Sequence, residues 1–309
     1  MKPDVLLTIF SAPKPCTNPH IAMIQQNAVS SWKALGERVE VVLIGNEAGI
    51  SELAAGASVT HIPEVACNSW GTPLISDMFL QARIINDSPL MACVNSDILL
   101  LPDFMETAQN ALIQLKGFLL VGRRYDLALS EYIVSSAGWG SRLEEKISKE
   151  GRLHPPGGSD YFIYPRDCFQ DIPDFAIGRA GWDNWMIYEA RQRGWKVIDA
   201  TGSIHVVHQD HDYSHLAGGE AHYRHPETEA NVRLAGGKRT IFTLGDAQLC
   251  VKDGQILPIR RTWKKFWREV EIFPLIILHS FLLSQFFYSL FHPLRAYIEF
   301  RAWLRSKKS

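Results

Sequence analysis

A polar tripeptide interrupts an apolar segment in the first third of the chain. Residues 91–104, MACVNSDILLLPDF, pass from apolar residues to Asn95-Ser96-Asp97 and then return at once to apolar residues and a proline. A carboxylate there could bind a ligand, because parallel sheets bind ligands in the crevice at the carboxyl ends of their strands. A simple turn is the alternative, since Asn and Asp often close strands by bonding to local backbone. We favour a ligand-binding role for Asp97, because the polar excursion is too brief for a surface loop.

Two more carboxylates and a group of histidines stand where they could take part in chemistry. Asp160 lies where the tight loop at 155–158 meets an apolar strand, and Asp183 lies at the start of a helix, after Gly181. A turn residue is the alternative for Asp160, and a helix N-cap is the alternative for Asp183. Six histidines follow between residues 205 and 225.

Alternating strands and helices must position these groups. Apolar runs predict strands at 5–10, 39–44, 58–62, 90–94, 117–122, 195–200 and 203–208, and helical spacing predicts helices at 20–35, 73–86, 103–115 and 183–193. Crossovers of this length join parallel strands and place helices on both faces of the sheet. The sequence therefore predicts an α/β, Rossmann-like fold with a mostly parallel sheet flanked by helices.

Across about residues 4–210 the chain resembles glycosyltransferases of the GT-A fold, and family 2-like members most closely. The segment NSD stands where these enzymes carry Asp-x-Asp at the end of a central strand, with Asn95 in place of the first aspartate. The resemblance implies transfer of a sugar from a nucleotide-diphosphate donor to a hydroxyl acceptor, either a glycan or a lipid-linked molecule. It also implies that Asp97 holds a divalent cation beneath the donor, with Asn95 beside it. Oxygen ligands suit Mn²⁺ or Mg²⁺.

The same resemblance implies a set of donor-binding residues. Thr8 and Phe10, in LLTIFSAPKP, match the segment that holds the base and ribose, and core packing is the alternative for both. Asn46 matches a position that contacts the base, and a turn residue is its alternative. Gly71 and Thr72 precede a helix whose N-terminus would lie near the phosphates, and a helix cap is the alternative for Thr72.

Acceptor binding and catalysis follow from the resemblance in the same way. Inverting enzymes of this fold place an Asp or Glu at a helix start after a Gly/Trp loop, which implies that Asp183 is the catalytic base. That carboxylate must lie within hydrogen-bond reach of the acceptor hydroxyl. Asp160 would face the acceptor, and Trp182 would stack on a sugar ring unless it is a core residue.

The histidines allow two interpretations. In the glycosyltransferase interpretation, one histidine after the last sheet strand completes the cation site with Asp97, and we favour His208, with His211 or His205 as substitutes. In the other, HVVHQDH (205–211) resembles the His-x-His-x-Asp-His of metallo-β-lactamase-like zinc enzymes, which predicts a metal-dependent hydrolase. Its spacing differs by one residue, and it follows an α/β unit instead of lying early in an αββα sandwich. We expect the remaining three, His215, His222 and His225, to be polar loop residues.

Two further function classes stay open. A nucleotidyltransferase shares this sheet and a metal carboxylate, although SAPKP lacks the Gly-rich basic loop expected after its first strand. A non-catalytic sugar-nucleotide binder would tolerate the weakened NSD motif. A nucleic-acid partner is not expected, because the formal net charge is −1 and no binding motif is present.

Cysteine usage and the N-terminus predict the compartment. The five cysteines are odd in number, widely scattered and without a Cys-x-x-Cys pair, which favours reduced thiols and a cytoplasmic setting. The segment MKPDVLLTIF has too short an apolar run for a secretory signal peptide.

The C-terminal part changes in character. Residues 1–245 are expected to form the catalytic domain, and 246–309 a hairpin at 247–259 followed by an aromatic, apolar and basic tail. Within 260–309, basic clusters bracket many Trp, Phe and Tyr residues, which predicts an interfacial helix pair on the anionic inner face of a membrane. A helical hairpin packed on the domain or in a dimer is the alternative. Membrane contact would suit a lipid-linked acceptor or a polysaccharide precursor.

Overall fold

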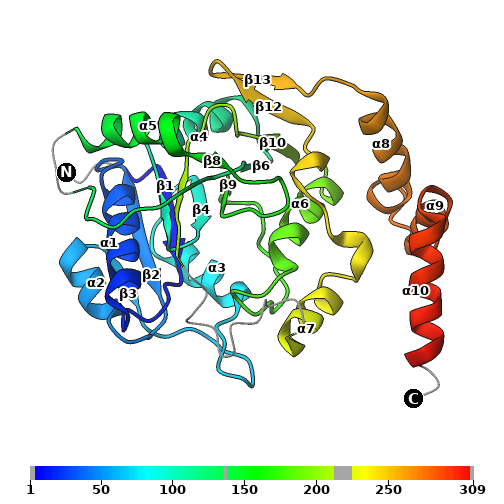
Figure 1. The fold of residues 1–309 in the computed structure, drawn as a ribbon, viewed down its shortest axis with the longest axis horizontal. Helices are drawn as coiled ribbons and strands as arrows, with labels where there is room; N and C mark the ends of the chain where they lie inside the picture. Colours follow the sequence, from blue (N-terminus) through cyan, green and yellow to red (C-terminus); the bar gives the residue numbers. More distant parts are fainter. Residues whose placement is uncertain (1–3, 135–137, 212–224, 307–309) are drawn as a thin grey trace.

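The computed structural model describes residues 4–134, 138–211 and 225–306. A mostly parallel sheet lies between two layers of helices (Figure 1). Strand β9 is antiparallel to both of its neighbours and β13 is antiparallel to β12, whereas the other pairs of this sheet are parallel. The predicted α/β class is confirmed. Among the described residues the main sheet has nine strands, in the spatial order β13 (Gln255–Pro258), β12 (Leu249–Lys252), β10 (Lys196–Asp199), β6 (Phe118–Val121), β9 (Tyr161–Pro165), β4 (Leu90–Val94), β1 (Leu7–Ser11), β2 (Val39–Ile44) and β3 (Thr60–Ile62).

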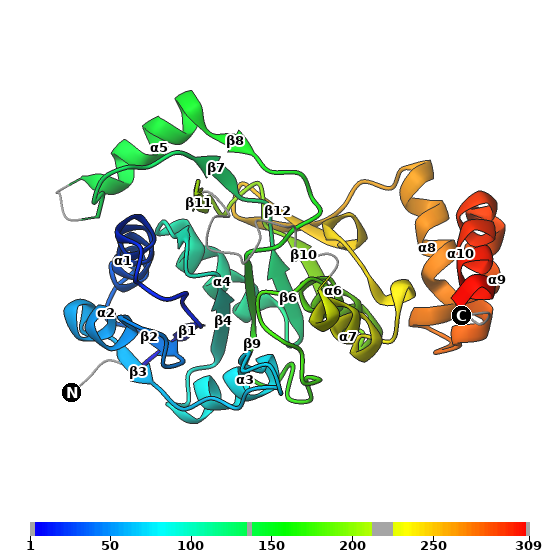
Figure 2. The same ribbon diagram turned by 60° about the horizontal axis from the view of Figure 1, so that its bottom comes forward.

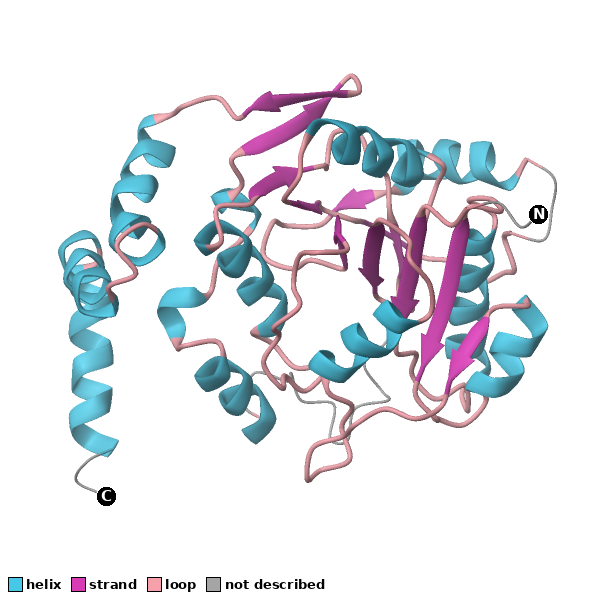
Figure 3. Cartoon of the chain, turned by 180° about the vertical axis from the view of Figure 1, so that it is seen from behind, coloured by secondary structure: helices cyan, strands magenta, loops and turns pink. Residues whose placement is uncertain are grey.

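Alternating strand side chains build two apolar layers, one on each face of the sheet. Leu7 and Ile9 of β1 pack with the helices of one face, and Phe10 packs with those of the other. Figure 3 shows the sheet from behind, with helices on both sides. The first face carries α1 (Pro19–Lys33), α2 (Ile50–Ala57) and α4 (Asp103–Gln114), and the second carries α3 (Ile75–Ile84) and α6 (Trp182–Gln192).

Most predicted elements agree with the observed ones to within two residues at each end. The strand predicted at 203–208 is an exception, because only Val207–Gln209 (β11) is extended. The amides of Ser203 and Ile204 both donate to the carbonyl of Ala200, so this part of the segment is a turn. His208 therefore lies in the middle of its strand and not at the end.

A second, smaller sheet was not predicted from the sequence. Its strands have only two or three residues, too few for a side-chain period to be recognised. Helix α5 (Trp139–Glu150) covers it through Leu143 and Ile147 (Figure 2). This sheet matters for function because β5 directly follows Asp97 and pairs with β11. The order of its strands is β5 (Ile98–Leu99), β11, β7 (Tyr125–Leu127) and β8 (Arg152–Leu153).

The C-terminal segment begins as part of the main sheet and continues as helices outside it. The predicted hairpin is confirmed, with β12 and β13 joined at Asp253 and Gly254, and β12 pairs in parallel with β10. The following helices are α8 (Trp263–Ile276), α9 (Phe281–Phe291) and α10 (Pro293–Ser306), at one end of the molecule (Figure 1). None of the described helices has both the length and the apolar character needed to span a bilayer. The domain boundary at 245/246 stays a prediction.

Candidate active site at the carboxyl edge of the sheet

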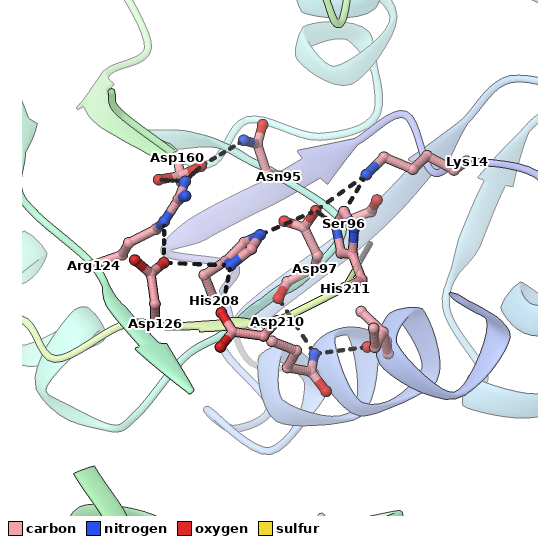
Figure 4. A network of polar contacts seen from close by, with 12 residues as sticks. Lys14, Asn95, Ser96, Asp97, Arg124, Asp126, Asp160, His208, Asp210 and His211 are labelled. Carbon is pink, nitrogen blue, oxygen red and sulfur yellow. Dashed lines mark hydrogen bonds and ion pairs between the residues drawn. The ribbon is translucent and has the colours of Figure 1, made fainter. Parts of the chain in front are cut away.

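Polar side chains from four segments that adjoin strands of the main sheet meet at one edge of it, together with a fifth segment, residues 208–211 (Figure 4). Lys14 follows β1, Asn95 and Asp97 follow β4, and Arg124 follows β6. The carboxyl ends of parallel strands share an edge, so these segments converge. Asp160 precedes β9, whose antiparallel direction brings its start to the same edge, and the Asn95 amide donates to the Asp160 carbonyl at 2.8 Å.

Asp97 lies at the centre of this network and is only 8% exposed. Its Oδ2 lies 3.2 Å from Nε2 of His211, 3.4 Å from Nζ of Lys14 and 3.9 Å from Nε2 of His208. Burial by itself would raise the pKa of this carboxyl, but the hydrogen bond from His211 and the charges of Lys14 and His208 hold the pKa well below its usual range. Its Oδ1 is buried and has no hydrogen-bond partner among the described residues. A buried oxygen of this kind calls for a partner, such as a bound water or ion.

The small sheet positions His208 beside Asp97. His208 is the register partner of Asp126 on β7 and of Ile98 on β5. Its Nδ1 lies 3.4 Å from Oδ1 of Asp126 and 3.8 Å from Oδ1 of Asp210, while Nε2 faces Asp97. Burial lowers the pKa of His208, which favours the neutral imidazole that can bind a metal.

The ligand atoms of Asp97, His208 and His211 all lie within 4.8 Å of one another, close enough to hold one metal ion. One carboxylate and two imidazoles form a donor set that Mn²⁺ accepts, while Mg²⁺ prefers oxygen alone. The unpartnered Oδ1 of Asp97 supports the fit. The structure thus brings Asp97 together with His208, the pair favoured from the sequence, and adds His211. Their role as metal ligands stays a prediction.

Asp160 is held in an ion pair. Nη1 of Arg124 donates to both of its oxygens, at 2.6 and 2.7 Å, and Nδ2 of Asn95 donates to Oδ1 at 2.9 Å. Nε of Arg124 also donates to Asp126 at 2.8 Å. A continuous chain of polar contacts therefore runs from Asp160 through Arg124, Asp126 and His208 to Asp97 (Figure 4). The acceptor-binding role of Asp160 stays a prediction.

Asp183 is the second residue of α6, so its interpretation as an N-cap is wrong. The helix begins at Trp182, and the residue before it is Gly181, whose φ of +113° favours glycine. Oδ1 of Asp183 accepts a hydrogen bond from the Gly181 amide at 3.3 Å. Burial raises the pKa of Asp183, and the charge of nearby Asp160 raises it further. A carboxylate with a raised pKa is a stronger base when ionised.

Three residues predicted to contact donor or acceptor lie in the core. Thr8 is fully buried, and its hydroxyl makes hydrogen bonds to side chains in the turn before β4. Phe10 packs edge-to-face on a phenylalanine of α3, and Trp182 packs on a phenylalanine of β9. Asn46, in contrast, is exposed directly after β2. The binding roles of all four stay predictions.

The loop with Gly71 and Thr72 is folded onto Asn68. Oδ1 of Asn68 accepts from the Thr72 amide at 3.0 Å, and the Gly71 amide donates to the Asn68 carbonyl at 3.0 Å. Nδ2 of Asn68 donates to Glu227 of α7 (Pro226–Leu234) at 2.6 Å. Helix α3 begins only at Ile75, so the alternative that Thr72 caps this helix is wrong. The donor-binding role of Gly71 and Thr72 stays a prediction.

His205 pairs with a carboxylate other than Asp97. Its Nδ1 lies 2.6 Å from Oδ2 of Asp103, at the start of α4, and its amide donates to the same oxygen at 3.0 Å. Of the three histidines within residues 205–211, all of them described, only His208 and His211 contact the side chain of Asp97.

The hydrolase interpretation therefore lacks its fold, and the first histidine of its motif does not converge with the other two. A mostly parallel sheet is not an αββα sandwich, and the first histidine of HVVHQDH is committed to Asp103. His225 lies in a turn before α7, where its ring accepts a hydrogen bond from the Glu227 amide. His215 and His222 lie outside the described residues.

Several members of the network were not singled out from the sequence. Lys14 stands in SAPKP after the first strand, and Arg124 and Asp126 stand in GRRYD after the strand that ends at Val121. The strand-end rule that selected Asp97 could have found all three. No comparable signal identified Asp210, whose place depends on the unpredicted small sheet.

Comparison with known proteins gives only distant likenesses. No protein-family model matches the chain, and no curated protein matches its sequence. Glucosyl-3-phosphoglycerate synthase from Mycobacterium tuberculosis is 14% identical, with a TM-score of 0.46 over 76% of this chain and 82% of that one. Another structure of that enzyme, in complex with Mn²⁺, UDP and glucosyl-3-phosphoglycerate, is 13% identical, with a TM-score of 0.45 over 76% of this chain and 81% of that one. A mannosyltransferase from Pyrobaculum calidifontis in complex with GDP-Man and Mn²⁺ is 12% identical, with a TM-score of 0.44 over 68% of this chain and 59% of that one. At this distance the likeness to these glycosyltransferases assigns no activity to the chain.

Proposed function

We propose that this protein is a glycosyltransferase that moves a sugar from a nucleotide-diphosphate donor to a hydroxyl acceptor. The observation that carries the proposal is Asp97, a buried carboxylate with an unpartnered oxygen at the carboxyl edge of the sheet, beside His208 and His211. A divalent cation held by these three side chains, whose nitrogen donors favour Mn²⁺ over Mg²⁺, would neutralise charge that develops on the departing diphosphate. Asn95, two residues before Asp97, and the exposed Asn46 would contact the donor.

Asp183 is the proposed catalytic base. It takes the proton of the acceptor hydroxyl while the hydroxyl oxygen forms a bond to the anomeric carbon. The bond from that carbon to the diphosphate breaks, and the nucleoside diphosphate leaves with the electron pair. Attack from the face opposite the leaving group inverts the configuration. The raised pKa of Asp183 supports this role, because it makes the ionised carboxylate a stronger proton acceptor.

The remaining proposed roles follow the geometry of the edge. The charge of Asp160 is close enough to Asp183 to raise the pKa of the Asp183 carboxyl. Asp160, held by its ion pair with Arg124, would position the acceptor. Thr8, Phe10 and Trp182 would act from the core by shaping the strands and the helix that line the site. Gly71 and Thr72 would border the binding site of the donor diphosphate.

The first experiment is calorimetric titration with UDP, GDP and related diphosphates, each with and without Mn²⁺. We expect one diphosphate to bind in the presence of Mn²⁺ and an Asp97→Ala variant to lose that binding. Asp87→Ala is the matched control, because Asp87 has a fully exposed side chain outside the network. Tight Zn²⁺ binding without nucleotide binding would favour the hydrolase instead. Turnover of a nucleoside triphosphate with release of pyrophosphate would favour the nucleotidyltransferase, and sugar-nucleotide binding without turnover would favour the binder.

We also propose that the C-terminal helices contact the anionic cytoplasmic face of a membrane, where a lipid-linked or polysaccharide-precursor acceptor would be found. Helix α9 exposes Leu282 (86%), Leu290 (66%) and Phe286 (64%) and carries no charged residue. Exposed basic residues stand on either side of it, among them Lys264 at the start of α8 and Arg295 in α10. An apolar helix with basic flanks is complementary to an anionic lipid surface.

Co-sedimentation with vesicles of phosphatidylglycerol and phosphatidylcholine tests the membrane proposal. We expect binding that requires the anionic lipid, and a Leu282→Asp/Phe286→Asp variant that no longer binds. Ile113→Asp is the control, because Ile113 is as exposed (77%) but belongs to α4. If the protein does not bind vesicles and instead dimerises through α9, a second copy of the chain covers this surface.

A further inference from the structure

Lys14 occupies the neighbourhood in which a cation would bind. Its Nζ lies 3.4 Å from Oδ2 of Asp97 and 3.3 Å from Nε2 of His211 (Figure 4). These two atoms belong to two of the three side chains that could hold a metal ion. The ammonium therefore already neutralises the carboxylate that a divalent cation would require.

Hydrogen bonds hold the backbone of Lys14, whereas its side chain is partly exposed. Gln25 of α1, which is 1% exposed, accepts from the Lys14 amide at 2.7 Å and donates to the Lys14 carbonyl at 2.8 Å. The same amide oxygen of Gln25 accepts from the hydroxyl of Ser96, next to Asp97, at 2.9 Å. The Lys14 side chain is 37% exposed, so its ammonium can leave Asp97 without unfolding the loop.

An ammonium and a divalent cation repel each other when they share one carboxylate, so the two compete for Asp97. We propose that Lys14 is the counter-ion of Asp97 in the ligand-free protein and becomes a donor-binding residue when the cation takes its place. The displaced ammonium then pairs with the diphosphate of the donor, which lies beside the cation. This inference rests on the proposed glycosyltransferase function, because it requires a diphosphate ligand at this edge of the sheet.

This exchange predicts that Lys14 has opposite effects on the binding of the cation and of the diphosphate. Lys14 weakens the binding of the cation alone, because the cation must displace it. Lys14 strengthens the binding of the diphosphate once the cation is present, because a charge-assisted contact is added. A lysine that only stabilises the loop would produce neither effect.

The test measures both ligands on wild type and Lys14→Met. Free Mn²⁺ is followed by electron paramagnetic resonance, and the diphosphate that binds wild type is then titrated calorimetrically at saturating Mn²⁺. In Lys14→Met we expect Mn²⁺ alone to bind about three- to tenfold more tightly, and the diphosphate to bind about tenfold more weakly. Lys14→Arg keeps the charge and should stay near wild type in both. Lys33→Met is the control, because Lys33 is an exposed lysine in the last turn of α1.

The outcomes separate this inference from the proposed function. Suppose that wild type binds Mn²⁺ and a diphosphate, and that Lys14→Met binds both with the same affinities. This result would overturn the role of Lys14 and leave the glycosyltransferase proposal standing. Weaker Mn²⁺ binding in Lys14→Met would also overturn it, because competition predicts the opposite sign. Wild type that binds Mn²⁺ but no diphosphate would overturn both the proposed function and the second role of Lys14. The unfolding midpoint of each variant shows whether the fold is intact.

Discussion

The carboxyl edge of the sheet and the C-terminal helices are built in opposite ways. At the edge, polar and ionisable groups are buried and paired: Asp97 is 8% exposed, and the side chain of His211 is 3% exposed. In the helices, large apolar side chains are exposed, such as Trp263 (77%), Leu282 (86%) and Leu294 (78%). Burying a charge is costly unless it has partners, so the edge is pre-organised for a small charged ligand. The helices present an apolar surface of the kind that marks interaction sites.

The two regions meet where α8 packs on α6. Ile272, Leu275 and Ile276 of α8 are buried in the same apolar layer as the residues of α6. Arg191 of α6 donates to Glu269 of α8 at 2.7 Å and to the carbonyl of Asp246 at 2.5 Å. The first C-terminal helix is therefore fixed to the α/β unit, while α9 exposes most of its apolar side chains.

The largest effect is expected at the edge. Asp183→Asn removes the proposed base, so kcat should fall on the order of 10²- to 10⁴-fold while Mn²⁺-dependent diphosphate binding persists. Steady-state kinetics and calorimetry on the same preparation measure the two quantities. A fall in activity explained entirely by lost donor binding would contradict the base role. Asp87→Asn, at an exposed site, should leave both unchanged.

The pH dependence sharpens this prediction. The base must be ionised, so kcat/KM should fall as the pH drops through the pKa of Asp183, which burial raises above the ordinary value of 3.8. The raised pKa of Asp183 has the opposite effect on the free energy of unfolding. A carboxyl with a raised pKa in the folded state destabilises the protein as the pH rises through that pKa. At neutral pH, Asp183→Asn should therefore unfold at a urea concentration no lower than that for wild type. An activity profile with its inflection at or below 3.8 would contradict the assignment.

A smaller effect is expected at the junction of the two regions. Arg191→Met removes hydrogen bonds from a charged, buried donor, which should lower the free energy of unfolding by about 2–3 kcal/mol. Urea denaturation measures the loss. Arg193→Met is the matched control, because its side chain is 51% exposed and its i,i+4 pair with Glu189 should contribute below about 1 kcal/mol. Equal losses in the two variants would argue against a fixed junction.

A comparison of α8 with α9 includes the smallest expected effect, that of an exposed leucine. Ile272→Ala removes buried methyl groups and should cost about 2 kcal/mol or more, because Ile272 is 4% exposed. Leu282→Ala should change the free energy of unfolding by no more than about 0.5 kcal/mol, because Leu282 is 86% exposed. Urea denaturation at two protein concentrations measures both. A large, concentration-dependent loss for Leu282→Ala would indicate that α9 is covered by a second copy.

The success of the sequence analysis varied with the length of the element. Strand β4 is a continuous apolar run of five residues, and β2 is apolar at every position except Glu40. Helices such as α1 repeat their apolar residues at helical spacing, so these strands and helices were predicted nearly to their ends. Strands β5, β7, β8 and β11 have two or three residues, and their pairing depends on contacts between distant segments. The place of Asp97 was predicted because the end of a parallel strand is a local feature of the sequence.

By itself, the sequence determined the α/β class, the position of Asp97 after a central strand and the contrast between the α/β unit and the aromatic, basic tail. Only the tertiary structure decided which partners Asp97 has. His205 and His208 are three residues apart, yet one pairs with Asp103 and the other faces Asp97. Lys14 reaches the same carboxylate from a segment 83 positions away. Side-chain periodicity records which residues a helix or strand buries, whereas convergence at a site depends on strand order and register, which long-range packing sets.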